Sequence, residues 1–265
     1  MYHPFNYDHV IYGADAINAR ISNTKSIMNL NGTEVWLFDD LVVKGKGSTT
    51  LQEAYSMMLV KENTTVPVPE IYACYKIGKV SYIVMQRIKG ESLDHVVDKL
   101  DDNELKSVYD QLHSYVKELR RIGSDFYGRV DRTPFSDLLL FPKLDTVFTS
   151  YEDFVQYWIS RYEKHIAPTS CMAMRSMLLS CPNTPVLVHG DLVPSNIMVD
   201  GSKIVAIIDW ATAGFYPMSW EYLSAFMHDS RNRRTVNMIL PHIHETPLEF
   251  MCYKEIIYLL MRFES

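Results

Sequence analysis

Cysteine is scarce in this sequence, and no two cysteines form a paired motif. The 265 residues contain four, which are Cys74, Cys171, Cys181 and Cys252. They lie far apart without a C-x-x-C pair, so the sequence gives no support to a zinc site or a redox motif. We expect buried free thiols in a reducing compartment.

The sequence also lacks long apolar runs and an excess of basic residues. No uncharged apolar run approaches the length that spans a bilayer, and the N-terminus has neither the basic start nor the apolar core of a signal peptide. The formal net charge of −6 argues against a dedicated nucleic-acid binder, because phosphate backbones require clustered Lys and Arg. We therefore predict a cytoplasmic protein with no membrane or nucleic-acid partner. We also expect a monomer, although no feature of the sequence determines the oligomeric state.

Short strands separated by turn dipeptides dominate the first third of the chain. A helix should follow the third strand, because Leu51 to Leu59 have helical apolar spacing and Thr50 with Glu53 fits a capping box. Asn31-Gly32 is a strong hairpin dipeptide. We expect an antiparallel five-stranded sheet with one helix on a face, preceded by a docked leader over 1–24 that is helical over 8–21. The predicted strands are 26–30, 34–38, 41–44, 71–77 and 80–87.

The rest of the chain is predicted to be mostly helical. Apolar positions from Leu105 to Ile122 mark a long amphipathic helix with Asp101 or Asp102 as its cap. A surface loop over 123–150 should follow. We predict an α+β protein with an N-terminal lobe at 1–88 and a C-terminal lobe at 89–265. Further helices are expected at 151–166, 169–179, 220–228 and 248–263.

Two carboxylates follow short apolar runs between Val186 and Trp210. These are Asp191 and Asp209, and Asn196 opens another apolar run between them. Because buried strands hold their ends rigidly, this arrangement predicts that the three side chains meet around one small volume. Carboxylate and amide oxygens suit a magnesium–phosphate centre, with Asp191 orienting or deprotonating a hydroxyl and the other two binding Mg²⁺. In the alternative, both carboxylates only close turns.

Two neighbours of these acids are expected to act structurally. His189 should brace the loop around Asp191 through hydrogen bonds, rather than carry protons itself. Glu221 is expected to bond to the backbone near the same loop.

The motif HGDLVPSN at 189–196, with IIDW at 207–210, resembles the signature of aminoglycoside phosphotransferases and their relatives. These are small-molecule kinases with the protein-kinase fold, and their fungal-type members are most similar. The resemblance covers most of the chain in the expected order. It continues through 42–44, 53–54, 83–85, 90–93 and 213–217.

The resemblance implies how a nucleotide is bound. Lys44 would contact the α- and β-phosphates and pair with Glu53, although a solvated lysine, a Glu53 that only caps its helix, and Glu62 as partner are alternatives. The adenine would lie against a connector that follows the last strand of the sheet. Implied nucleotide contacts there are Met85, Gln86 and Ile88, with Met198 and Ile208 packing on the ring or only in the core.

The family resemblance implies an ATP-dependent kinase that moves the γ-phosphoryl of ATP to a hydroxyl of a small molecule, with Mg²⁺ as metal. One departure from protein kinases is the loop at 29–33, which has a single glycine in place of G-x-G-x-x-G. A nucleotide-binding module without turnover and a protein kinase are the alternatives. A metal-dependent phosphohydrolase would need further metal ligands, and His242 with His244 is the only close histidine pair.

Overall fold

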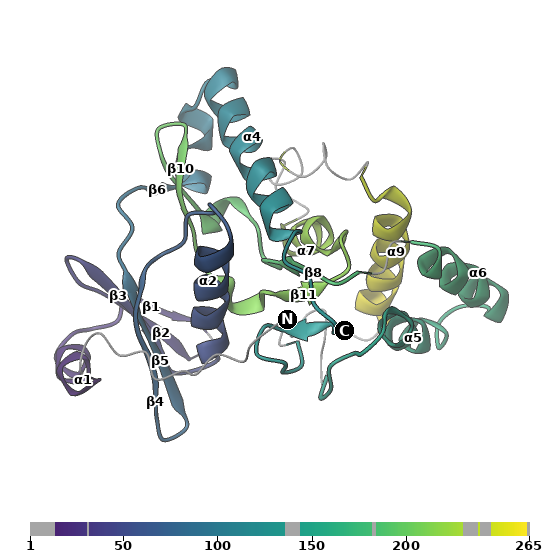
Figure 1. Ribbon diagram of the computed structural model, residues 1–265, viewed down its shortest axis with the longest axis horizontal. Coiled ribbons are helices and arrows are strands. Elements are labelled where there is room, and N and C mark those ends of the chain that lie inside the picture. The colour runs from purple at the N-terminus through teal and green to yellow at the C-terminus, as the bar shows by residue number, and fades with distance from the viewer. Residues whose placement is uncertain are drawn as a thin grey trace. The chain divides into compact units, whose positions relative to one another are not determined.

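The structure is a computed structural model that describes residues 14–30, 32–135, 144–181, 184–229, 238 and 245–263. His242 and His244 lie outside these ranges. The chain forms two compact units, of which the first contains 1–115 and 195–211 and the second contains 116–194 and 212–265 (Figure 1). The chain thus returns to the first unit once. The lobe boundary between residues 88 and 89 stays a prediction.

The first unit is built on the predicted five-stranded sheet. Its order is β1-β2-β3-β5-β4 and every neighbouring pair is antiparallel. Helix α2 (Leu51–Asn63) follows the third strand, which confirms the predicted order of strands and helix. The strands are β1 (Met28–Leu30), β2 (Thr33–Leu37), β3 (Leu41–Gly45), β4 (Ile71–Ile77) and β5 (Val80–Gln86).

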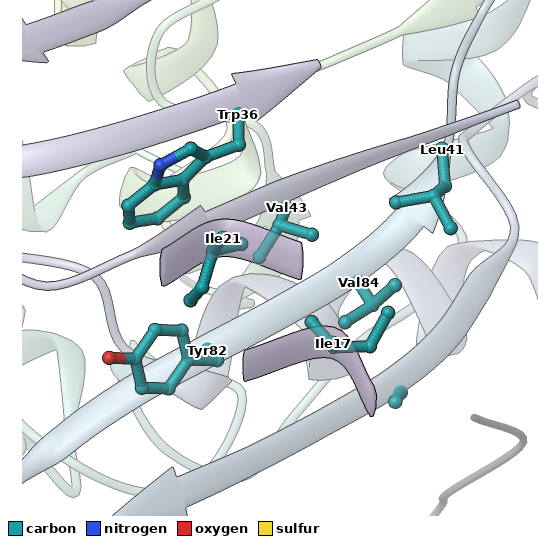
Figure 2. Close-up of a cluster of buried hydrophobic side chains, with 8 residues drawn as sticks. Ile17, Ile21, Trp36, Leu41, Val43, Tyr82 and Val84 are labelled. Carbon is teal, nitrogen blue, oxygen red and sulfur yellow. The ribbon is translucent and has the colours of Figure 1, made fainter. Parts of the chain in front are cut away.

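The two faces of this sheet are covered by different helices. Side chains alternate along a strand, so Val43 points to one face of β3 and Lys44 to the other. Helix α1 (Ala14–Ser22) packs Ile17 and Ile21 into the cluster that contains Val43 (Figure 2). Lys44 reaches α2 on the opposite face. The described part of the leader therefore docks as predicted, and Lys44 is turned away from that cluster.

Two helix caps were predicted from the sequence, and the structure confirms the one that precedes α4. The side chain of Asp101 accepts hydrogen bonds from the N–H groups of Asn103 and Glu104, both at 2.9 Å, at the start of α4 (Asp102–Leu119). At α2, Thr50 is the N-cap residue but makes no side-chain capping bond. The Thr50 side chain therefore does not form its half of the predicted capping box, and the carboxylate of Glu53 binds Lys44.

A second, smaller sheet in the first unit carries part of the motif region. Strands β6 (Glu91–Ser92), β9 (Ile197–Asp200) and β10 (Lys203–Ile207) pair in the order β10-β9-β6. The predicted turn at Asp200-Gly201 joins β9 to β10, with Gly201 at a φ of 57°. Gln111 of α4 accepts from the N–H of Ile204 and donates to the carbonyl of Ser202, which fixes this hairpin to the helix. Short helices α3 (Leu93–Val96) and η1 (Val97–Lys99) precede α4.

The second unit is mostly helical, as predicted. Its helices surround an aromatic core in which the rings of Phe154, Trp158 and Tyr253 contact Trp220 at centroid distances of 5.4 to 5.6 Å. A three-stranded sheet has the order β7-β11-β8. Strand β7 falls inside 123–150, where only a loop was expected. The elements are β7 (Gly128–Arg129), α5 (Tyr151–Tyr162), α6 (Pro168–Leu179), β8 (Val186–Val188), β11 (Gly214–Tyr216), α7 (Trp220–Asp229) and α9 (Pro247–Phe263).

The structure describes all four cysteines. All four cysteines are free, and three are buried, whereas Cys181 is partly exposed, contrary to expectation. Within the described ranges, no helix combines the length and the apolar character needed to cross a membrane.

Candidate active site

The loop that carries Asp191 begins at the end of the buried strand β8. Its backbone is held by Glu221, a buried residue in the first turn of α7. The carboxylate of Glu221 accepts from the N–H of His189 at 2.7 Å and from that of Gly190 at 3.1 Å. The predicted structural role of Glu221 is confirmed, because one buried side chain satisfies two backbone donors of the loop.

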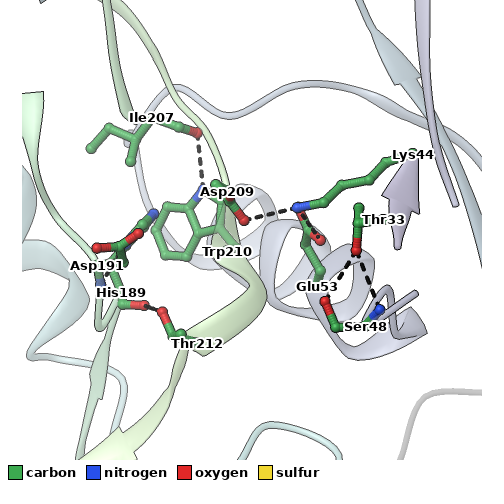
Figure 3. Close-up of polar contacts among 10 residues, drawn as sticks. All are labelled: Thr33, Lys44, Ser48, Glu53, His189, Asp191, Ile207, Asp209, Trp210 and Thr212. Atoms are coloured by element: carbon green, nitrogen blue, oxygen red, sulfur yellow. Dashed lines mark hydrogen bonds and ion pairs between the residues drawn. The ribbon is translucent and has the colours of Figure 1, made fainter. Parts of the chain in front are cut away.

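His189 stabilises the same loop from within. It is fully buried, and its Nδ1 accepts a hydrogen bond from the backbone N–H of Asp191 at 3.1 Å. The carbonyl of His189 accepts from the hydroxyl of Thr212 at 3.1 Å (Figure 3). Since the backbone N–H must be the donor, Nδ1 has no proton and Nε2 carries it. The predicted bracing role of His189 is confirmed.

Gly190 allows this loop to pass close to Thr212. Its φ is +81°, in the left-handed region that favours glycine. A Cβ atom at this position would lie 2.9 Å from the carbonyl oxygen of Thr212. The glycine between His189 and Asp191 is therefore required by the backbone path of the loop.

The carboxylate of Asp191 has a partner that was not predicted from the sequence. Oδ1 lies 3.1 Å from Nδ1 of His228, and the two side chains are 32% and 20% exposed. His228 is in the last turn of α7 and Glu221 in its first turn, so one helix contacts the loop at both ends. His228 belongs to none of the motifs found in the sequence and lies 37 positions from Asp191, so the pair was not predicted.

Lys44 is the centre of an ionic network in the first unit. Its ammonium lies 2.9 Å from both carboxylate oxygens of Glu53 and 2.8 Å from Oδ1 of Asp209 (Figure 3). Burial lowers the pKa of Lys44, but the two carboxylates raise it by more, so its net pKa lies above the ordinary value. Glu53, and not the exposed Glu62, is the partner of Lys44.

A backbone hydrogen bond joins the segments that carry Asn196 and Asp209. The N–H of Ile208 donates to the carbonyl of Asn196 at 2.9 Å, next to Asp209. Asp209 follows β10 with a φ of 60°, and its side chain is 45% exposed, whereas Asn196 is buried at the end of the short helix η2 (Pro194–Asn196). Both residues belong to the first unit. Asp191 belongs to the second unit, and its convergence with them stays a prediction.

The other predicted nucleotide contacts all belong to the first unit. Met85 of β5, Met198 of β9 and Ile208 are half-buried, as is Ile88. Gln86 is exposed, and its side-chain oxygen accepts from the N–H of Glu70 at 3.3 Å. Their burial and hydrogen bonds do not indicate a ligand, so the role of these residues in nucleotide binding stays a prediction.

The start of β2 is held by the loop that precedes α2. The hydroxyls of Thr33 and Ser48 are 3.0 Å apart, and the N–H of Ser48 donates to the Thr33 hydroxyl at 3.2 Å (Figure 3). Gly47 has a φ of +49°, and a Cβ atom there would lie 2.2 Å from the backbone nitrogen of Thr33. This support was missed from the sequence. Asn31, in the middle of the predicted phosphate-covering loop, lies outside the described residues.

The antiparallel sheet with its lysine–glutamate pair, together with the motif loops, defines a protein with the kinase-like phosphotransferase fold. The family model described as "Phosphotransferase enzyme family" (APH) matches residues 45–245. The chain belongs to this family.

The individual relatives compared share a low sequence identity with this chain, between 15% and 22%. The hygromycin-B 4-O-kinase of Escherichia coli is 22% identical over 176 residues, which are 62% of this chain and 48% of that protein. The match therefore spans about half of the curated relative. A mutant aminoglycoside phosphotransferase APH(4)-Ia in a ternary complex with ADP and hygromycin B is 15% identical, with a TM-score of 0.63 over 93% of this chain and 88% of that chain. The streptomycin–ATP complex of APH(2")-IIa is 18% identical, with a TM-score of 0.56 over 94% and 88%. At these identities the solved structures establish the fold.

Proposed function

We propose that this protein transfers the γ-phosphoryl group of ATP to a hydroxyl group of a small molecule. The observation that carries the proposal is the network of Lys44, Glu53 and Asp209 in the first unit. A charged lysine held by two carboxylates is positioned to bind phosphate oxygens, and it keeps its proton because its pKa is raised. Membership of the phosphotransferase family supports the same reaction.

Asp191 is assigned to the acceptor hydroxyl. The hydroxyl loses its proton to this carboxylate, its oxygen forms the new bond to the γ-phosphorus, and the bond from phosphorus to the β-phosphate oxygen breaks. The loose transition state of such reactions needs mainly positioning and charge neutralisation. The hydrogen bonds from the loop backbone to Glu221 and His189 give Asp191 the fixed support that this role needs.

The side chains of Asn196 and Asp209 suit Mg²⁺. Amide and carboxylate oxygens are the ligands that this ion takes in proteins, and the carboxylate of Asp209 is accessible at 45% exposure. Among the residues with described positions, no group of three or more His, Cys, Asp or Glu side chains could hold a metal. A bound Mg²⁺ would neutralise phosphate charge and help to orient the triphosphate.

The acceptor class is proposed from the relatives. A curated relative is named as a kinase of hygromycin B, and solved relatives contain hygromycin B or streptomycin. Aminoglycosides are therefore the first hydroxyl compounds to test, followed by simpler amino alcohols and sugars. We also propose a monomer in the cytoplasm, where the four free thiols would remain reduced.

The test is ADP formation by the purified protein with ATP, Mg²⁺ and a panel of hydroxyl compounds. Asp191→Ala should abolish transfer while ATP binding is largely kept, and Asp209→Ala should weaken binding of the magnesium–nucleotide complex. Asp209→Asn is the matched control for backbone shape, because asparagine also tolerates a positive φ. ATP binding without product from any hydroxyl compound would favour the module without turnover. Full turnover by Asp191→Ala would refute the role of Asp191.

A further inference from the structure

His228 contacts the carboxylate of Asp191 but has no role in the proposed reaction so far. The imidazole Nδ1 and the carboxylate Oδ1 are 3.1 Å apart within the second unit. We infer that His228 is a positioning residue, which holds the carboxylate of Asp191 in the orientation that accepts the proton of the acceptor hydroxyl. This inference rests on the proposed function.

The direction of the hydrogen bond follows from the chemistry of the two groups. An ionised carboxylate has no proton to donate, so the imidazole must supply it from Nδ1. With an ionised Asp191, Nδ1 of His228 would therefore carry a proton, whereas Nδ1 of His189 accepts a hydrogen bond from the backbone. The two histidines near Asp191 thus act on different parts of it, because His189 binds its backbone N–H and His228 its side chain.

Helix α7 holds His228 in a fixed position relative to the loop of Asp191. The buried carboxylate of Glu221 in its first turn binds the backbone of residues 189 and 190. His228 in its last turn binds the side chain of residue 191. Because helical hydrogen bonds make these two turns one rigid element, the loop backbone and the carboxylate orientation are fixed by the same helix. A hydrogen bond to a charged group that is lost from such a site should cost a factor of about 10 to 100 in rate.

The experiment compares three replacements at one position. His228→Leu removes the donor, His228→Gln places an amide near the position of Nε2, and His228→Asn places an amide near the position of Nδ1. We expect kcat to fall by about 10- to 100-fold in the first two, with KM for ATP little changed, and to be largely restored in the third. His165→Leu is the matched control, since His165 is also half-buried in the second unit but stacks on Phe263.

A double-variant comparison separates positioning from general stability. In the background of Asp191→Asn, replacement of His228 by leucine should cause no further loss of the residual rate, because the group that His228 orients has been changed. Equal losses in both backgrounds, or an unchanged kcat in His228→Leu, would overturn the inference. An inactive wild-type protein would instead overturn the proposed function itself.

The tautomer can be measured without turnover. The ¹⁵N spectrum of the wild-type protein at neutral pH, with the His228 signals assigned by their loss in His228→Asn, should show a proton on Nδ1. The balance of tautomers should change in Asp191→Ala. A wild-type imidazole protonated only on Nε2 would overturn the inference even if the leucine variant failed to fold.

Discussion

Glu221 offers the most direct test of how the active-site loop is stabilised. The residue is 2% exposed, and its carboxylate accepts hydrogen bonds from the backbone N–H groups of His189 and Gly190. We consider two replacements, Glu221→Ala, which removes both acceptors, and Glu221→Gln, which keeps one oxygen and turns the other into a donor. The two variants differ little in backbone preference, because both residues are good helix formers.

The expected magnitudes follow from the number of donors left unpaired. Each buried N–H without an acceptor lowers the free energy of unfolding by about 1–3 kcal/mol. Glu221→Ala leaves two such groups, the N–H of His189 and that of Gly190. Part of this loss is offset, because burial raises the pKa of Glu221 above its ordinary value of 4.5 and so the charged form is itself costly. We expect a loss of about 2–4 kcal/mol in the free energy of unfolding for Glu221→Ala and about 1–3 kcal/mol for Glu221→Gln.

The pH dependence of this difference has a definite sign. A carboxyl group whose pKa is raised by folding binds its proton more tightly in the folded state than in the unfolded state. Its contribution to stability is therefore full below pH 4.5 and is lost as the pH rises through the higher pKa of the folded state. The wild-type protein should gain stability relative to Glu221→Gln as the pH is lowered from neutrality toward 4.5.

The assay is urea unfolding of the wild-type protein and both variants at several pH values, followed by tryptophan fluorescence. Trp158 and Trp220 are buried in the second unit and report its unfolding. Hydrogen exchange of the amides of His189 and Gly190 gives a local measurement that does not depend on two-state unfolding. Variants with wild-type stability and unchanged protection of these two amides would refute the argument.

Three further predictions test other parts of the molecule. Gly190→Ala should lose about 2–4 kcal/mol of stability and most activity, because a Cβ atom would meet the carbonyl of Thr212; unchanged melting would contradict this. Glu53→Gln should raise KM for ATP by about 10-fold through misplacement of Lys44, and titration of ATP binding by calorimetry would detect it. Ile17→Ala should cost about 2–4 kcal/mol of α1 docking, seen as faster hydrogen exchange in α1, and wild-type protection there would show that the helix docks by other contacts.

Local features of the fold were predictable because they depend on neighbours in the sequence. The hairpin turn at Asp200-Gly201 and the helix cap at Asp101 are each formed within a few residues. The strand order around α2 followed from turn dipeptides and apolar spacing. The extra strand β7 was not predictable, because its two residues are ordered by pairing with β11, far along the chain.

The partners of the functional side chains required the tertiary structure. The family resemblance predicted roles for Lys44 and Asp191, but the sequence left two carboxylates, Glu53 and Glu62, as possible partners of Lys44. In the structure, Glu53 of α2 is the residue whose carboxylate binds Lys44.

By itself, the sequence determined which residue types are present and how short segments fold, because dihedral preferences and nearest neighbours act over a few residues. Only the tertiary structure decided that Asp209 binds a lysine 165 residues away and that His228 binds Asp191. Such contacts arise where helices and strands pack against each other, and no local pattern encodes them.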